Sequence, residues 1–360
     1  MPCCAYPTLR FLASKSTSTV PKTIGTGVLF SAAILRSKNL PSNFQNFILI
    51  PGRFLQNSSS TCATKMSDIS ETKSLSSFPL SHGGSIPIVA YGLGTANYKS
   101  GRSDLDKAVI ADTKTAIKIG FTHLDGAEVY GNEEELGISI RESGIPRSQL
   151  FVTTKVHKSI SSPKNALTTS LEKLGTEYVN LYLIHAPFWD EKEKGITIEA
   201  AWQEMEEIYR EGRAKAIGVS NFSIPELKRI ADVAKIQPAV NQIEYHPYLQ
   251  SPELVAYHRQ HGILTAAYGP LVPITKGAPG PLDDLITNLS EKYSKSPTQI
   301  LLRWAIDMGA VAITTSSKEW RMKEALEVSS FKLDSEDVEN IRKIGTQKQR
   351  RVFWTKNFKD

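Results

Sequence analysis

Cysteine is scarce in this sequence and missing from most of it. The three cysteines are Cys3, Cys4 and Cys62, and none follows Cys62. A chain without cysteine can form neither a disulfide framework nor a Cys-ligated metal site. We therefore expect the part of the chain after Cys62 to fold without disulfides and to hold no metal.

Acidic residues are missing from residues 1–65, which contain seven Lys and Arg residues. The whole chain has a formal charge of +6, so subtracting these seven charges leaves about −1 for residues 66–360. The basic pI of about 9.0 thus comes from one end of the chain. A nearly neutral remainder gives no reason to expect a nucleic-acid partner.

Long hydrophobic runs are also missing, and the best one in the leader, residues 27–35, is too short to span a bilayer. We expect no membrane partner. Residues 1–65 are rich in Ser and Thr, which together with Arg and the lack of acids is typical of an organelle transit peptide. Alternatively, Met66 is the natural start and residues 1–65 are an upstream extension. Both interpretations remain open, and in both we expect a disordered leader.

The remaining residues, 66–360, predict one domain in which short apolar strands alternate with amphipathic helices. A hairpin is expected at Phe78–Val89, and the first helix at residues 104–118, with Leu105, Ala108, Val109, Ala116 and Ile117 on its buried face. With the short strand that precedes this helix, the chain contains eight strand-then-helix units, which fit a (β/α)₈ barrel, the TIM-barrel fold. The alternative is an open doubly wound sheet, which we disfavour because the glycine pattern at Gly92–Thr95 lacks the third glycine of a dinucleotide loop.

Polar residues fall where these predicted strands end. Asp125, Lys155 and His185 end or follow three successive strands, and Tyr130 lies in a turn marked by Gly126 and Gly131. The other strand-end residues are Ser220, Asn221, Gln242, Tyr268, Ser316 and Arg321. Taken singly, each is an ordinary turn, cap or packing residue. Together they predict one site at the carboxyl ends of the strands, where barrel enzymes place their active sites.

The segment FTHLDGAEVYGNE and the strand ends that follow it resemble the aldo-keto reductase family, over about Phe78 to Ile344. The resemblance implies a (β/α)₈ barrel closed below by the hairpin and covered on its active face by the C-terminal tail. It also implies that Asp125, Tyr130, Lys155 and His185 are catalytic. Lys155, held by Asp125, is expected to lower the pKa of Tyr130, the general acid, while His185 orients the carbonyl. We expect His123 and His246 to be packing residues.

The same resemblance implies NADPH as the cofactor, bound without a Rossmann fold. Ser220, Asn221 and Gln242 match residues that hold the carboxamide, and Tyr268 matches the stacking aromatic, followed by Gly269 and Leu271. Ser316, Ser317, Lys318 and Arg321 match the segment that binds the 2′-phosphate. Thr315 departs from the family, which usually has a basic residue there, and we expect Lys318 and Lys323 to compensate.

The substrate pocket departs further, because Ala96, His157 and Ala186 stand where many family members have tryptophan. We expect the two alanines to widen the pocket and His157 to make its wall more polar. Two aromatic pairs could form new walls, either Phe188 with Trp189 or Phe353 with Trp354.

The function that follows is an NADPH-dependent reductase of aldehydes or activated ketones of the α-dicarbonyl type. The tail and the TTSSK motif resemble the fungal branch of the family, which reduces cyclic α-diketones and ketopantoyl lactone. The alternatives are a non-catalytic, NADPH-binding regulatory subunit and a sugar aldehyde (aldose-type) reductase. We expect a cytoplasmic monomer acting on a small-molecule carbonyl, or a mitochondrial one if the leader is translated and acts as a transit peptide.

Overall fold

The computed structural model describes residues 76–99, 101 and 104–358. The predictions for residues 1–65, and the domain boundary at Met66, lie outside the described residues.

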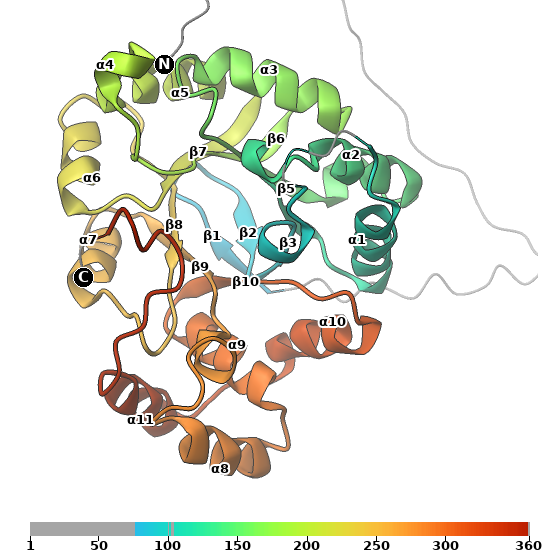
Figure 1. Cartoon of the computed structure of the whole chain (residues 1–360), viewed down its shortest axis with the longest axis vertical. Coiled ribbons are helices and arrows are strands. Elements are labelled where there is room, and N and C mark those ends of the chain that lie inside the picture. Colours follow the sequence, from blue (N-terminus) through green and yellow to red (C-terminus); the bar gives the residue numbers. More distant parts are fainter. Residues whose placement is uncertain (1–75, 100, 102–103, 359–360) are drawn as a thin grey trace, which may run out of the picture. The chain divides into compact units, whose positions relative to one another are not determined.

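A closed barrel of parallel strands forms the centre of the fold (Figure 1). Around the barrel the order is β10-β3-β4-β5-β6-β7-β8-β9, so neighbours in sequence are neighbours in space and β10 closes on β3. The predicted (β/α)₈ barrel is therefore confirmed, and the open doubly wound alternative is wrong. The strands are β3 (Val89–Gly92), β4 (His123–Asp125), β5 (Phe151–Val156), β6 (Val179–Ile184), β7 (Ala214–Ser220), β8 (Val240–Glu244), β9 (Leu264–Tyr268) and β10 (Ala310–Thr314).

The predicted hairpin is confirmed as β1 (Ser77–Pro79) and β2 (Ser85–Pro87), which pair antiparallel. Its turn contains Gly83 and Gly84, both with positive φ, the conformation that glycine adopts most readily. Leu80 and Ile86 belong to one buried cluster with strand residues such as Leu181, so the hairpin closes one end of the barrel. The active site must then lie at the other end.

Helices surround the barrel, and Figure 1 shows them as an outer ring. Within the residues described, none of them is long and apolar enough to cross a membrane. They are α1 (Lys107–Ile119), α2 (Glu133–Glu142), α3 (Pro163–Leu174), α4 (Glu191–Lys194), α5 (Ile198–Arg210), α6 (Ile224–Ala231), α7 (Pro252–Gln260), α8 (Asp283–Tyr293), α9 (Pro297–Asp307), α10 (Glu319–Leu326) and α11 (Ser335–Gly345), with 3₁₀ turns η1 (Thr95–Asn97), η2 (Glu128–Tyr130), η3 (Arg147–Gln149), η4 (Val272–Ile274) and η5 (Glu327–Ser330).

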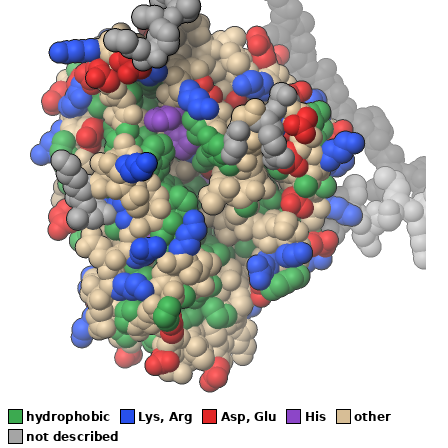
Figure 2. Space-filling model, in the orientation of Figure 1, with side chains coloured by type: hydrophobic (Ala, Val, Ile, Leu, Met, Phe, Trp, Pro, Cys, Tyr) green, Lys and Arg blue, Asp and Glu red, His purple; other side chains and the backbone are tan. Residues whose placement is uncertain are grey.

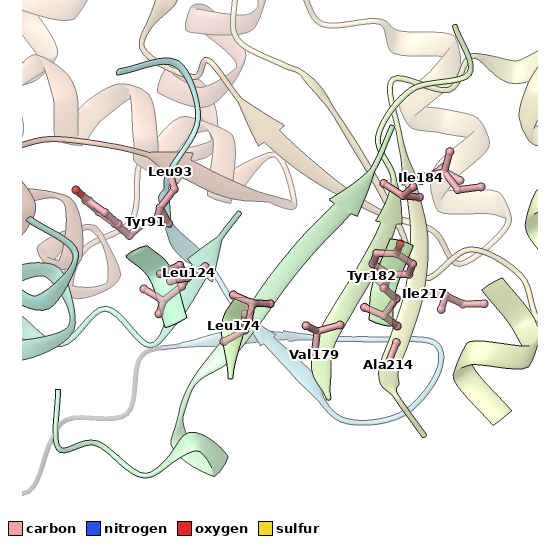
Figure 3. Packing of buried hydrophobic residues seen from close by; sticks show 14 of the residues in the cluster. Tyr91, Leu93, Leu124, Leu174, Val179, Tyr182, Ile184, Ala214 and Ile217 are labelled. Carbon is pink, nitrogen blue, oxygen red and sulfur yellow. The ribbon is translucent and has the colours of Figure 1, made fainter. Parts of the chain in front are cut away.

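Side chains alternate along each strand between the barrel interior and the layer under the helices. In β6, Leu181 and Leu183 belong to the interior cluster, whereas Tyr182 and Ile184 belong to the large cluster between strands and helices (Figure 3). This alternation is the pleat of a strand with both faces buried. It fixes the register, so the residues that end each strand are presented at the mouth of the barrel.

The first helix differs from its prediction. It begins at Lys107, because the Asp106 side chain caps it by accepting hydrogen bonds from the backbone N–H groups of Ala108 and Val109. Its buried face consists of Val109, Thr113, Ala116 and Ile117. The burial predicted for Leu105 and Ala108 is wrong, since Leu105 precedes the helix and Ala108 lies on its exposed side. The helices α4 and α11 were not predicted from the sequence.

Two buried histidines make the stability of the fold depend on pH. Burial lowers the pKa of both His123 and His258 from 6.5 to about 4. The neutral His258 ring lies between Asn241 and Thr265, at 2.9 Å from each partner atom. Below pH 6.5 the unfolded chain therefore binds protons that these folded rings do not, and stability falls with pH through the window from 6.5 to 4.

At pH 5, each ring is expected to remove about 2 kcal/mol of unfolding free energy, since 1.5 pH units at about 1.36 kcal/mol per unit are involved. Urea denaturation at pH 7, 6 and 5 measures this loss. His258→Gln, although less stable at every pH, should lose part of the pH dependence. An unfolding free energy that is the same at pH 7 and pH 5 would contradict the prediction.

Candidate functional site

A buried ion pair lies at the mouth of the barrel. Lys155 of β5 donates a hydrogen bond of 2.6 Å from Nζ to Asp125 Oδ1 on the neighbouring strand β4, and a second one of 2.8 Å to the carbonyl oxygen of Gly126. The Lys155 side chain is fully buried. Burial lowers the pKa of Lys155, and Asp125 opposes this by stabilising the ammonium. The predicted pairing of Asp125 with Lys155 is thus present.

Tyr130, the last residue of η2, lies next to this pair. Lys155 Nζ is 5.1 Å from the centre of the Tyr130 ring. Glycine is required at position 94, because a Cβ there would lie 2.9 Å from Tyr130 Cζ and 3.1 Å from its hydroxyl. Gly94 therefore leaves the space that the phenol occupies.

The predicted lowering of the pKa of Tyr130 is wrong for this arrangement. Burial first, and the charge of Asp125 second, raise the pKa of Tyr130 well above 10. The Lys155 ammonium donates its hydrogen bonds to Asp125 and Gly126 and lies 5.1 Å from the centre of the Tyr130 ring, and its charge does not outweigh the effect of burial. The phenol is consequently protonated throughout the neutral pH range.

His185 follows β6 and completes the cluster. Its ring is 5.6 Å from that of Tyr130, at 83°. Burial lowers the pKa of His185 well below 6.5, and the positive charge of Lys155 adds to the effect. The ring is therefore neutral at physiological pH and can donate a hydrogen bond from one nitrogen only. Its Nδ1 is buried and has no partner in the described part of the chain.

The residues predicted to hold the nicotinamide form a network beside the ion pair. Gln242 donates to Asp125 Oδ2 over 2.8 Å, and Tyr268 donates to Asn221 Oδ1 over 2.6 Å. Asn221, with φ 61°, donates to Ser220 Oγ and to the carbonyl oxygen of His185, both at 2.9 Å. The structure thus joins the ends of β6, β7, β8 and β9 around Asp125 and His185.

The segment predicted to bind the 2′-phosphate lines two adjoining pockets. One, of about 440 Å³, is lined by Ser316, Ser317, Lys318 and Arg321 together with Thr315, Asp106, which caps α1, and Asp112 of α1. The other, of about 580 Å³, is lined by Leu271, Trp320 and Arg321 among others. Lys323 is paired with Glu319 at 2.6 Å and lines neither pocket, so of the two lysines expected to compensate for Thr315 only Lys318 is placed to do so.

Figure 2 shows a hollow on the face seen in Figure 1, with a histidine side chain in it, hydrophobic side chains beside it and Lys and Arg side chains on the surface around it.

The ring of Trp354 contacts three other rings at the site. Trp354 of the C-terminal tail lies 6.0 Å from the His185 ring, 5.5 Å from that of His157 and 5.2 Å from that of Phe188. The predicted C-terminal tail over the active face is therefore confirmed.

Of the two aromatic pairs considered as pocket walls, one member of each reaches this cluster. Phe188 and Trp354 contact each other, whereas Trp189 packs against the main core and donates its indole N–H to the carbonyl oxygen of Ile196 over 3.0 Å. Phe353 packs on Tyr268 at 5.4 Å, on the cofactor side. Ala186 is fully buried, and Ala96 lines the smaller pocket.

Two glutamates at the site were not predicted from the sequence. Glu128 accepts hydrogen bonds from the backbone N–H groups of His157 and Ser159 and so ties η2 to the loop after β5. Glu244, at the end of β8, accepts two from the tail. Glu244 could have been found, because it shares strand parity with Gln242 and ends a strand.

The two histidines expected to be packing residues are both buried. His123 contacts Thr153 at 3.0 Å and the Phe151 ring at 4.7 Å inside the barrel. His246 contacts Glu244 at 3.2 Å. Across the described ranges, no group of three or more His, Cys, Asp and Glu side chains is placed to hold a metal ion.

Fold and site together define a (β/α)₈-barrel enzyme with its active site at the carboxyl ends of the strands. The sequence model described as "Aldo/keto reductase family" matches residues 90–346. The chain belongs to the aldo/keto reductase family, as its motifs indicated.

Similar proteins agree with this membership. The chain is 43% identical over 275 residues to the NAD/NADP-dependent indole-3-acetaldehyde reductase of Schizosaccharomyces pombe, covering 75% of this chain and 96% of the relative. It is 39% identical over 293 residues to the NADPH-dependent alpha-keto amide reductase of Saccharomyces cerevisiae, covering 78% and 94%. A crystal structure of a Bombyx mori aldo-keto reductase in complex with NADP matches with a TM-score of 0.69 at 35% identity, covering 75% of this chain and 92% of that one.

Proposed function

We propose that this protein reduces aldehydes and activated ketones to alcohols with NADPH. The observation that carries the proposal is the cluster at the barrel mouth, where the Lys155–Asp125 ion pair, the Tyr130 phenol and the neutral His185 ring lie together. A carbonyl oxygen that gains negative charge needs a proton donor and a hydrogen-bond donor beside it. This cluster offers both.

The residues present fit the proposed cofactor. The smaller pocket combines hydroxyl groups of Ser316 and Ser317 with the cations of Lys318 and Arg321, a donor set suited to a phosphate monoester. At the barrel mouth, Ser220, Asn221 and Gln242 present amide and hydroxyl groups beside Asp125. NADPH bound there supplies a hydride to the carbonyl carbon. The relatives named above are NADPH-dependent or NAD/NADP-dependent, and the similar solved structure holds NADP.

The roles of the catalytic residues follow from their surroundings. Tyr130 carries the proton at neutral pH, because its pKa is raised, and donates it to the carbonyl oxygen. The transfer remains favourable because an alkoxide is a stronger base than a phenolate. Lys155 stabilises the phenolate that is left behind, and Asp125 keeps the lysine charged and directed. His185, neutral, donates a hydrogen bond that orients the carbonyl oxygen.

The substrates that fit best are activated carbonyls with a second oxygen next to the first. His157 borders the site, 6.0 Å from the His185 ring, and burial lowers its pKa so that it is neutral. A neutral imidazole can donate a hydrogen bond from its N–H group to a neighbouring carbonyl oxygen. One similar protein is named an alpha-keto amide reductase, whose substrate class has two adjacent carbonyl groups.

NADPH oxidation, followed at 340 nm with a panel of simple aldehydes, α-keto esters and α-diketones, tests the proposal. We expect turnover with the panel and the highest kcat/KM for the dicarbonyls. Tight NADPH binding without turnover of any carbonyl would favour the regulatory-subunit alternative. A clear preference for aldose sugars would favour the aldose-type reductase.

Replacing His157 with phenylalanine is expected to lower kcat/KM for α-dicarbonyls by about three- to tenfold, the value of one neutral hydrogen bond. Simple aldehydes, which have no second oxygen, should change less than twofold. Phenylalanine keeps the ring against Trp354, so the pocket shape is preserved. Steady-state kinetics with an α-keto ester and an unsubstituted aldehyde measure the difference. An equal loss for both substrates would show that His157 only shapes the wall.

We also propose that the protein acts as a monomer in the cytosol. The near-neutral charge of residues 66–360 and the absence of a membrane-crossing helix from the described residues are compatible with this location. The mitochondrion is the alternative if residues 1–65 act as a transit peptide. Peptide mapping of the N-terminus of the native protein distinguishes the two.

A further inference from the structure

The carboxylate of Glu244 holds the C-terminal tail. Its Oε1 accepts a hydrogen bond of 2.8 Å from the backbone N–H of Val352, and its Oε2 accepts one of 3.0 Å from that of Phe353. His246 Nε2 lies 3.2 Å from the same Oε1. The Glu244 side chain is fully buried. A buried carboxylate accepts hydrogen bonds only, and here donors face both of its oxygens.

The residue after these two hydrogen bonds is Trp354, which has φ 56°. A positive φ is uncommon for a residue with a side chain and persists only where the surroundings hold it. Trp354 is the ring that contacts His185, His157 and Phe188. The backbone fixed by Glu244 therefore leads directly into the ring that covers the catalytic histidine.

Phe353, the residue before Trp354, is held on the side of the proposed cofactor residues. Its ring packs on that of Tyr268, with 5.4 Å between the ring centres. The Lys276 ammonium lies over the Phe353 ring, 5.0 Å from its centre. A Cβ on Gly269 would come within 3.3 Å of Phe353 Cε2, so the glycine leaves room for the Phe353 ring. The two aromatic residues thus diverge from the point where Glu244 holds the backbone, one toward the cofactor residues and one toward the substrate.

The tail before residue 352 has its own attachments. Arg350 donates its backbone N–H to the carbonyl oxygen of Tyr248 over 3.0 Å, and Lys348 Nζ donates to the carbonyl oxygens of Gly277 and Pro279 at 2.6 and 2.8 Å. The loss of Glu244 would therefore release only the last segment, which carries Phe353 and Trp354.

We propose that Glu244 is a positioning residue for substrate binding, which acts through the backbone of Val352 and Phe353 to place Trp354 over His185. The part that concerns the substrate rests on the proposed function. Glu244 does not touch the reacting atoms. Its contribution is to hold the wall of the pocket in one place, so that a bulky carbonyl substrate meets a preformed ring instead of a mobile tail.

Glu244→Gln tests the proposal with little change in shape. The amide keeps one acceptor oxygen but directs an NH₂ group at one of the two backbone N–H groups, so at least one hydrogen bond to the tail is lost. Hydrogen exchange of the full-length protein measures this directly. We expect the amides of Val352 and Phe353 to exchange at least about tenfold faster in the variant, while amides of the barrel strands are unchanged. Equal protection of the tail amides in both proteins would overturn the proposal.

Kinetics test the consequence for the substrate. For a bulky aromatic α-keto ester, KM is expected to rise by about tenfold in Glu244→Gln, the value of one lost hydrogen bond to a charged group, while kcat changes by less than about threefold. Trp354→Ala should have the same kind of effect, and the double variant should be no worse than Trp354→Ala alone, because both changes remove the same wall. Additive effects would show that Glu244 does not act through Trp354 and would overturn the proposal.

Glu244→Asp, which keeps the carboxylate on a shorter side chain, should restore part of the tail protection and part of the KM, and guards against a Gln variant that fails to fold. If the wild-type protein reduced no carbonyl at all, the proposed function would be wrong. The hydrogen-exchange measurement would still test whether Glu244 holds the tail.

Discussion

Replacing Tyr130 with phenylalanine is expected to lower kcat for carbonyl reduction by about 10²–10⁴-fold, the usual contribution of a positioned general acid. Phenylalanine keeps the ring between Gly94 and His185, so the packing of the site is retained. Only the hydroxyl is removed, and with it the proton donor. Initial rates of NADPH oxidation with an α-dicarbonyl, at saturating cofactor, measure the loss.

Two comparisons separate this effect from a general disturbance. The dissociation constant for NADPH, measured by quenching of protein fluorescence, should stay within about twofold, because the phenol is needed for the proton and not for the cofactor. Tyr98→Phe is the matched control, since its ring lies 6.4 Å from that of Tyr130 and is 41% exposed. Turnover of Tyr130→Phe within a few-fold of the wild type would remove Tyr130 from the mechanism.

Much of the site could be predicted from the sequence because the fold brings the ends of all its strands to one place. In a parallel barrel every strand points the same way, so a polar residue at the end of each strand reaches the same mouth. Asp125 and Lys155 are paired for this reason, being on adjacent strands, and Gln242 reaches Asp125 across the barrel. Periodicity and strand ends carry this information without any knowledge of distant contacts.

What the sequence could not provide were contacts between segments that share no periodic pattern. After α11, the described residues 346–358 form no strand or helix, and Glu244 contacts this tail across 108 residues of sequence. Helix boundaries fail for a local reason. Asp106 caps α1, so the helix begins three residues later than the predicted residue 104, and Leu105 lies outside it.

The electrostatic effects of the lysines could not be predicted from the sequence either. From the sequence, a lysine near a tyrosine suggests a lowered pKa for the phenol. In the structure the lysine is directed at Asp125, and burial of the phenol outweighs it. The order of residues cannot show which way an ammonium group points. For the same reason, Lys323 could be named as a phosphate ligand although it is paired with Glu319 on the surface of α10.

The cofactor pocket also has a feature that the motifs did not indicate. Asp106, which caps α1, and Asp112 of α1 line it together with Lys318 and Arg321. Their carboxylates oppose a phosphate dianion, and Thr315 supplies no charge to offset them. On the proposed assignment of this pocket, a preference for NADPH over NADH would depend on the cations that remain, and above all on the guanidinium of Arg321, which lines both pockets.

Replacing Arg321 with alanine is therefore expected to raise the dissociation constant for NADPH by about 10- to 100-fold, as expected for the loss of charge-assisted hydrogen bonds to the 2′-phosphate. The dissociation constant for NADH should rise by less than about threefold, because NADH has no phosphate at that position and loses only contact with the side chain. Fluorescence titration of both cofactors, at one fixed ionic strength, measures the two constants without any need for turnover.

Lys323→Ala is the matched control for this prediction. It removes a positive charge from the same helix, two residues away, but from a side chain that is paired with Glu319 and lines neither pocket. Its effect on both dissociation constants should be within about twofold, since an exposed charge outside the pocket is screened by solvent. If Arg321→Ala weakened NADPH and NADH equally, the guanidinium would be holding a part common to both cofactors, and the assignment of this pocket to the 2′-phosphate would be wrong.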